Sequence, residues 1–229
     1  MNENATGRYC VVIPAYNAAG TIGPVVQRVR AQGLPVVVVD DGSSDQTAAI
    51  AAQQGALVIS HLRNFGKGRA LRTGFDHVVR AVYDGVVTID ADGQHDPTEI
   101  IRLIREGERQ HAGVVVGDRM MNGRQMPLSR RWANWIMSGM ISAVSRQSIP
   151  DSQCGFRMIR RELLASVPLR SNCYEIESEL LLAAAARRWK IVSVPVRAIY
   201  DGHASHIRPV RDGFLFVWLL LLALFGRRR

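Results

Sequence analysis

The chain has 229 residues, a length that allows one large α/β domain with an appendage. Its hydrophobic fraction of 47% supports a substantial core and excludes general disorder. The formal charge of +9, from 29 Lys and Arg against 20 Asp and Glu, implies anionic partners: phosphorylated substrates, lipid headgroups or nucleic acid. Three cysteines without metal-ligand spacing fit a reduced, cytosolic compartment.

The first half of the chain predicts strands that alternate with helices. Residues 1–7 are polar, and we expect them to be disordered and to hold no signal peptide. Apolar runs followed by helical segments of about ten to fifteen residues indicate parallel pairing in a doubly wound sheet. The predicted strands are residues 9–13, 35–39, 57–60, 86–89 and 114–116. The first two predicted helices are residues 21–30 and a helix that is capped by Ser44 or Asp45 and ends near residue 54. A third helix opens within residues 63–68 and ends near residue 82, and a fourth begins at residues 96–99.

The second half of the chain is less regular. Residues 155–159 and 191–196 predict strands, and residues 174–188 predict a helix. Residues 120–127 contain glycine and proline and predict a mobile linker. We expect residues 8–210 to form one domain whose halves face a single cleft.

An apolar segment, residues 214–225, stands apart and is followed closely by three arginines. As a helix it would be about 18 Å long, which is shorter than the roughly 30 Å of a bilayer core. A helix that is apolar on every side is buried in protein or in lipid. Trp218 and the arginines suit a membrane interface. We therefore expect residues 211–229 to form a short apolar helix and a candidate membrane-interface anchor, with packing in the core or a dimer interface as the alternative.

Two carboxylates follow the fourth predicted strand. Asp90 and Asp92 are spaced i, i+2 and point to one side of an extended chain. Such hard oxygens suit Mg²⁺ or Mn²⁺, which in turn would hold a diphosphate. Gln94 adds a carbonyl oxygen as a further ligand, whereas His95 is better explained as a packing or hydrogen-bonding residue of the loop. The alternative is an acidic loop that caps the next helix.

Four motifs occur in an order that resembles the family 2 glycosyltransferases. They are Val11-Val-Ile-Pro-Ala-Tyr-Asn17, Val38-Val-Asp-Asp-Gly-Ser-Ser-Asp45, Asn64-Phe-Gly-Lys-Gly68 and Asp90-Ala-Asp-Gly-Gln94. The resemblance covers about residues 9–210 and is strongest to the polyprenyl-phosphate sugar synthases, such as dolichol-phosphate mannose synthase. It implies a GT-A fold, which is a Rossmann-like, mostly parallel sheet with helices on both faces. It also implies metal-dependent, inverting transfer of a hexose from a GDP-mannose or UDP-glucose type of donor to a dolichyl or undecaprenyl phosphate.

The same resemblance implies roles for individual residues. The implied nucleotide-sugar-binding residues are Pro14, Tyr16, Asn17, Asp41, Lys67, Asp90, Ala91, Asp92 and Arg119; the implied metal ligands are Asp90, Asp92 and Gln94; and the implied catalytic residues are Asp92, Arg119, Arg130, Arg131 and Arg208. Two positions depart from the family pattern. Ala18 stands where glutamate is usual, and Gly93 stands where mannose synthases often carry leucine, so the nucleobase and the sugar stay open.

The chemistry of a phosphate acceptor fits a site of this composition. A phosphate monoester is mostly dianionic at pH 7, so it needs positioning rather than a strong general base. Arginines offer bidentate recognition of phosphate. A divalent cation would stabilise the departing nucleoside diphosphate.

Several of these features also have simpler interpretations. Arg130 and Arg131 could form a solvated helix face, and the stripe of large apolar residues over 132–144 could pack in the core or face lipid. Lys67 between glycines suggests a phosphate cradle but lacks the Walker pattern. The three glutamates within 175–179 do not share one helix face, so we expect no joint metal site, although one of them could lie near the sugar.

Two rival functions remain open from the sequence. One is a family 2 enzyme that glycosylates a glycan hydroxyl in cell-surface polysaccharide synthesis, which would need a general base. The other is a basic nucleic-acid-binding module, but the chain carries no recognisable nucleic-acid motif and we expect no such partner. The expected partners are the nucleotide sugar, the polyprenyl phosphate and a membrane surface on its cytoplasmic side. A homo-oligomer or a separate membrane subunit stays open.

Overall fold

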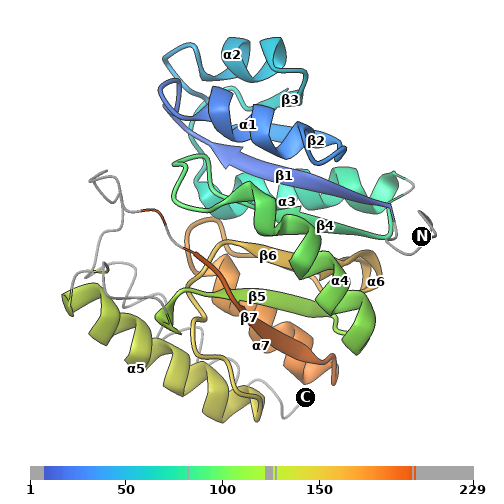
Figure 1. Ribbon diagram of the computed structural model, residues 1–229, viewed down its shortest axis with the longest axis vertical. Coiled ribbons are helices and arrows are strands. Elements are labelled where there is room, and N and C mark those ends of the chain that lie inside the picture. Colours follow the sequence, from blue (N-terminus) through green and yellow to red (C-terminus); the bar gives the residue numbers. More distant parts are fainter. Residues whose placement is uncertain (1–7, 82, 122–125, 127, 198, 200–229) are drawn as a thin grey trace.

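A computed structural model describes residues 8–81, 83–121, 126, 128–197 and 199, except the side chain of Arg130. Within these residues seven strands form one sheet in the order β3-β2-β1-β4-β6-β5-β7 (Figure 1). The strands are β1 (Tyr9–Ala15), β2 (Val36–Asp40), β3 (Leu57–Ser60), β4 (Gly85–Thr88), β5 (Val114–Asp118), β6 (Arg157–Arg160) and β7 (Ile191–Pro195). Every strand of this described sheet runs in one direction except β6, so the prediction of a mostly parallel α/β sheet is confirmed.

Helices cover both faces of the sheet, as predicted. In Figure 1, α1 and α4 lie in front of the sheet and α3 and α7 lie behind it, while α5 runs along the edge of the molecule and packs on α7. The helices are α1 (Ile22–Arg30), α2 (Thr47–Gln53), α3 (Lys67–Arg80), the 3₁₀ turn η1 (Pro97–Glu99), α4 (Ile100–Gln110), α5 (Leu128–Ser145), α6 (Arg161–Ser166) and α7 (Ile176–Ala186). Among the residues described, no helix combines the length and the apolar content that crossing a bilayer requires. The predicted C-terminal helix lies outside the described residues.

The sequence patterns explain these elements. Every residue of β1 and β2 is buried, as a parallel sheet covered on both faces requires. The helix start predicted at 96–99 is confirmed: Asp96 caps η1, which leads into α4, by accepting a hydrogen bond of 3.0 Å from the Thr98 amide, and Pro97 occupies the next position. Gly107 lets α4 approach the sheet, since a Cβ there would lie only 1.7 Å from the Met158 Cε atom.

Strand β6 shapes the edge of the sheet at which the parallel strands end, because it runs antiparallel between β4 and β5. It therefore begins where its neighbours end, and it carries residues 151–157 to the carboxyl edge of the parallel strands. The fully buried guanidinium of Arg157 fixes this segment by donating to the carbonyl oxygens of Cys154 at 2.7 Å, Ser152 at 2.6 Å and Glu177 at 2.5 Å. The three carbonyls satisfy a cation that burial would otherwise penalise.

Candidate active site

Asp90 and Asp92 lie in the loop that follows β4, at the carboxyl edge of the sheet. The Asp92 carboxylate accepts a 2.9 Å hydrogen bond from the Gln94 amide across a turn in which Gly93 has a φ of 76°. Burial, and then the charge of Asp90, raise the pKa of Asp92. The charge of Asp90 thus disfavours ionisation of Asp92, and a cation bound by both carboxylates would relieve this repulsion.

Lys67, at the start of α3, places its ammonium group against the first of these carboxylates. Its Nζ atom lies 2.7 Å from Asp90 Oδ1 and 2.7 Å from Glu177 Oε1. Burial alone would lower the pKa of Lys67, but the two carboxylates outweigh it and the pKa is raised. Burial would likewise raise the pKa of Asp90, but the charge of Lys67 outweighs it and the pKa is lowered. Lys67 therefore keeps Asp90 ionised and fixed in place.

The glycines on either side of Lys67 have a packing role. A Cβ on Gly66, whose φ is 98°, would lie 2.5 Å from the Asn172 carbonyl oxygen. A Cβ on Gly68 would lie 2.6 Å from the carbonyl carbon of the same residue. The close approach of the segment before α7 to the start of α3 explains both glycines, and it places Glu177 within reach of Lys67. A phosphate cradle in this motif stays a prediction.

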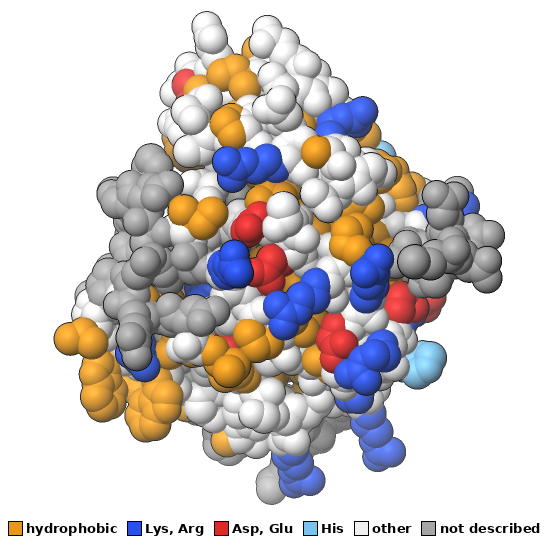
Figure 2. All heavy atoms as spheres, viewed as in Figure 1, with side chains coloured by type: hydrophobic (Ala, Val, Ile, Leu, Met, Phe, Trp, Pro, Cys, Tyr) orange, Lys and Arg blue, Asp and Glu red, His pale blue; other side chains and the backbone are white. Residues whose placement is uncertain are grey.

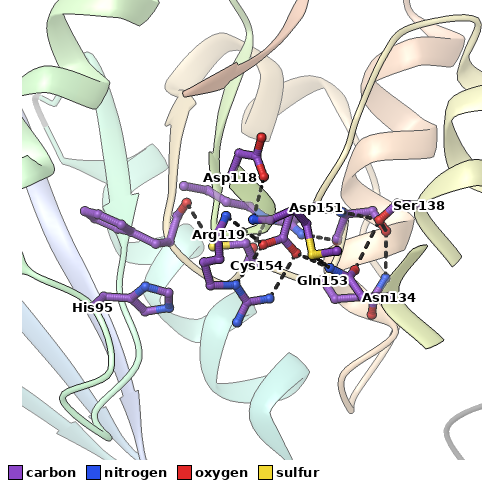
Figure 3. Close-up of polar contacts among 12 residues, drawn as sticks. His95, Asp118, Arg119, Asn134, Ser138, Asp151, Gln153 and Cys154 are labelled. Carbon is purple, nitrogen blue, oxygen red and sulfur yellow. Dashed lines mark hydrogen bonds and ion pairs between the residues drawn. The ribbon is translucent and has the colours of Figure 1, made fainter. Parts of the chain in front are cut away.

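Arg119, just after β5, is held by a buried carboxylate (Figure 3). Its Nε atom donates to Asp151 Oδ2 at 2.8 Å and its Nη2 atom to Oδ1 at 3.0 Å, a bidentate pair, and its backbone amide donates at 3.1 Å. Asn134 on α5 donates to the same Asp151 carboxylate at 2.8 Å, and Ser138 donates to Asn134 at 3.1 Å. Burial would raise the pKa of Asp151, but the bond to Arg119 outweighs it and the pKa is lowered.

The positive charge of Arg119 affects the ionisation of Asp90 and Asp92, in the loop after β4. It helps to lower the pKa of Asp90, and it partly offsets the rise in the pKa of Asp92. His95, to the left of Arg119 in Figure 3, has its Nε2 atom 4.0 Å from Asp90 Oδ2 and its ring against Phe156. Burial lowers the pKa of His95 to about 4, so the ring is neutral at pH 7. The site therefore places an anionic loop, which carries Asp90 and Asp92, and the fixed guanidinium of Arg119 at the same edge of the sheet.

The predicted nucleotide-binding residues after β1 and β2 build the loops at that edge. Asn17 adopts a left-handed φ of 49° and accepts a 2.9 Å hydrogen bond from the Ser44 amide. Asp41 is buried and accepts hydrogen bonds from the amides of Phe65 at 3.0 Å and Gly66 at 2.7 Å. Tyr16, by contrast, is 48% exposed. The roles of these residues toward a nucleotide stay predictions.

The remaining predicted residues divide into three groups. Pro14 and Ala91 are buried beside the site residues, and Gln94 is half-buried. Arg131 is exposed on α5, one turn before Asn134. The Arg130 side chain and Arg208 lie outside the part of the chain that the structure describes.

Sequence reasoning did not identify three contacts that shape the site. They are Glu177 on Lys67, Asp151 on Arg119, and Gly155 against Asp90, where a Cβ would lie 2.7 Å from the carboxylate. Each contact joins segments that are far apart in the chain; Lys67 and Glu177 are 110 residues apart. No local sequence pattern predicts contacts between segments so far apart.

The donor atoms present fit a divalent cation that arrives with a diphosphate. In the described residues no group of three or more His, Cys, Asp or Glu side chains is arranged to hold a metal by itself. Mg²⁺ commonly uses only one or two carboxylates and completes its shell with water and substrate phosphates. The hard-oxygen pair of Asp90 and Asp92 would supply such a partial site.

Comparisons with known proteins agree with this geometry. The model of glycosyl transferase family 2 matches residues 10–167. An uncharacterized protein of Methanocaldococcus jannaschii is 31% identical over 97% of this chain and 94% of its own length. A UDP-N-acetylglucosamine–dolichyl-phosphate N-acetylglucosaminyltransferase of Methanococcus voltae is 30% identical over 95% and 96% of the two chains. An undecaprenyl-phosphate 4-deoxy-4-formamido-L-arabinose transferase of Photorhabdus laumondii is 32% identical over 86% and 61%.

Solved structures support the fold. The glucosyl-3-phosphoglycerate synthase of Mycobacterium tuberculosis, in complex with Mn²⁺, UDP-glucose and phosphoglyceric acid, superposes with a TM-score of 0.71. It is 23% identical, and the match covers 96% of this chain and 79% of that one. The GT-A fold expected from the sequence is thereby confirmed. This protein is a glycosyltransferase, and the chain belongs to glycosyl transferase family 2.

Proposed function

We propose that this glycosyltransferase moves a hexose from a nucleotide sugar to a polyprenyl phosphate at the cytoplasmic face of a membrane, with Mg²⁺ or Mn²⁺ as cofactor. The observation that carries the proposal is the pairing of an anionic loop, Asp90 and Asp92, with the rigid cation Arg119, whose charge reaches both carboxylates. The two carboxylates would hold the cation that binds the donor diphosphate, and the arginine would bind the acceptor phosphate. Relatives named for transfer to dolichyl and undecaprenyl phosphate support this acceptor class.

The residues have distinct tasks in such a transfer. An acceptor phosphate oxygen attacks the anomeric carbon, the bond to the diphosphate breaks, and the configuration inverts. Asp90 and Asp92 would hold the cation, which stabilises the charge on the departing nucleoside diphosphate. Lys67 keeps Asp90 ionised and oriented. Arg119, braced by Asp151, positions the acceptor phosphate, and no general base is required because that phosphate is already anionic.

A donor screen tests this proposal. The protein is incubated with polyprenyl phosphate in detergent, with Mg²⁺ or Mn²⁺, and with GDP-mannose, UDP-glucose or UDP-N-acetylglucosamine in turn, and nucleoside diphosphate release is followed. We expect release with one donor, its loss on chelation with EDTA, and its recovery when either cation is added in excess. Turnover with a glycan hydroxyl or with phosphoglyceric acid, and none with polyprenyl phosphate, would overturn the acceptor assignment.

Gly155→Ala is expected to damage the site while sparing the fold. The added Cβ would lie 2.7 Å from Asp90 Oδ2, so the carboxylate must move. A misplacement of about 1 Å can cost about 100-fold in rate, and we expect a loss of that order in kcat/KM together with weaker Mn²⁺ binding. The matched control is Gly20→Ala, where a Cβ meets no atom within 4 Å. Equal activity of the two variants, at equal melting temperatures, would contradict a fixed role for Asp90.

A further inference from the structure

The outer face of α5 exposes more apolar surface than a helix of a soluble domain normally leaves uncovered. Leu128, Trp132, Trp135 and Ile136 are 72%, 64%, 63% and 50% exposed. The two indole rings contact each other edge to face, with centroids 5.7 Å apart. Figure 2 shows apolar side chains gathered at the lower left of the molecule, where α5 lies in Figure 1. Large apolar patches of this kind mark interaction sites.

The opposite face of the same helix is anchored in the domain. Asn134, Ser138 and Ile141 are buried, and Met137 and Met140 pack against the core. The predicted apolar stripe over 132–144 is thus divided: its later part packs inward and the tryptophans face outward. Because Asn134 bonds to the carboxylate that braces Arg119, the inner face of α5 borders the cation that would meet the acceptor phosphate.

The charge of α5 identifies the partner that it fits. The helix contains two arginines and no acidic residue from Leu128 to Ser145. Arg131 is exposed near its start, and Arg146 is exposed just after its end. Tryptophan prefers the boundary between acyl chains and headgroups, and arginine is attracted to anionic lipid headgroups. An exposed face that combines tryptophans with arginines therefore suits contact with the plane of a membrane interface.

We propose that the exposed face of α5 is the surface with which this protein rests on an anionic lipid bilayer. The helix of 18 residues is about 27 Å long and lies parallel to the bilayer plane. One face then contacts lipid while the other borders the site, so a phosphate at the bilayer surface is presented toward Arg119. The link to the acceptor rests on the proposed function, whereas the contact with lipid rests on the exposed residues alone.

Vesicle binding by the full chain tests the surface. In co-sedimentation with phosphatidylglycerol vesicles, Trp132→Ser combined with Trp135→Ser is expected to weaken binding by at least about tenfold. The matched control replaces two exposed leucines at the opposite end of the sheet, Leu57→Ser with Leu62→Ser, and should bind as the unmodified protein does. Arg131→Gln should weaken binding about fivefold on phosphatidylglycerol and not on phosphatidylcholine.

Two outcomes would overturn the proposal. Binding that the tryptophan variant leaves unchanged would place the contact elsewhere, for example on residues 214–225. A dimer, seen by ultracentrifugation, that the tryptophan variant dissociates without change in vesicle binding would assign the face to a second copy of the chain.

Activity separates the lipid contact from the acceptor chemistry. With a long-chain polyprenyl phosphate in vesicles, the tryptophan variant should show a higher KM, and with a short, water-soluble prenyl phosphate it should match the unmodified protein. Absence of turnover by the unmodified protein with either acceptor would count against the proposed function and leave the vesicle result standing.

Discussion

Asp92→Asn is expected to lower kcat/KM for sugar transfer by about a hundredfold to a thousandfold with little loss of stability. The amide oxygen of asparagine can still accept the hydrogen bond from Gln94, which at present measures 2.9 Å, so the turn should keep its shape. The substitution removes the second negative charge of the Asp90–Asp92 pair, and it should therefore weaken the binding of a cation and of the diphosphate that the cation holds. Steady-state kinetics and Mn²⁺ titration measure the two effects separately.

The matched control is a second Asp→Asn change four residues later. Asp96 caps η1, the turn that leads into α4, through the Thr98 amide, and asparagine is as good a cap as aspartate. We expect Asp96→Asn to keep both activity and melting temperature. Full activity of Asp92→Asn in the presence of a chelator would eliminate the metal-assisted mechanism.

The parallel part of the sheet could be predicted because its sequence signals are local. The strand predicted at 35–39 corresponds to β2, all of whose residues are buried, and such an unbroken apolar run is what a strand covered on both faces requires. The polar loops then follow from parallel pairing, which places the ends of β1, β2 and β4 at one edge. Asp90 and Asp92 could be located at that edge from the sequence alone.

The direction of β6 could not be predicted. Its residues, Arg157–Arg160, are apolar in the middle, and that pattern is the same for a parallel and an antiparallel strand. Yet this direction is what brings Gly155 against Asp90 and Asp151 onto Arg119. Helix α6 was also not predicted, because it has six residues and no side chain that caps its first turn.

The alternatives for the stripe on α5 could be resolved only by tertiary packing. Helical spacing places Trp132, Ile136, Met140 and Val144 in neighbouring positions, but it does not say which part the domain covers. Helix α5 packs on α7, and Met140 and Val144 are partly buried against the core, whereas Trp132 and Ile136 stay exposed. The sequence therefore located an interaction surface without separating it from the core.

Lys67→Met is expected to lower the free energy of unfolding by about 3 kcal/mol in the absence of divalent cations. Lys67 lies 2.7 Å from both Asp90 and Glu177, whose side chains are only 24% and 7% exposed. Methionine keeps the length of the side chain but leaves two largely buried carboxylates without a counter-charge. Unfolding in urea, with and without EDTA, measures the loss.

Divalent cations should restore part of that stability, and more in the variant than in the unmodified protein. A cation that binds only the folded state stabilises it by mass action, and Asp90 in the variant no longer shares its charge with an internal ammonium. Arg69→Met, two residues later on the same helix and exposed, is the matched control and should stay within about 0.5 kcal/mol of the unmodified protein. If Lys67→Met were as stable as Arg69→Met without cations, the ammonium would not be what neutralises the carboxylates. If its activity also survived, Asp90 would not depend on Lys67 for its place in the site.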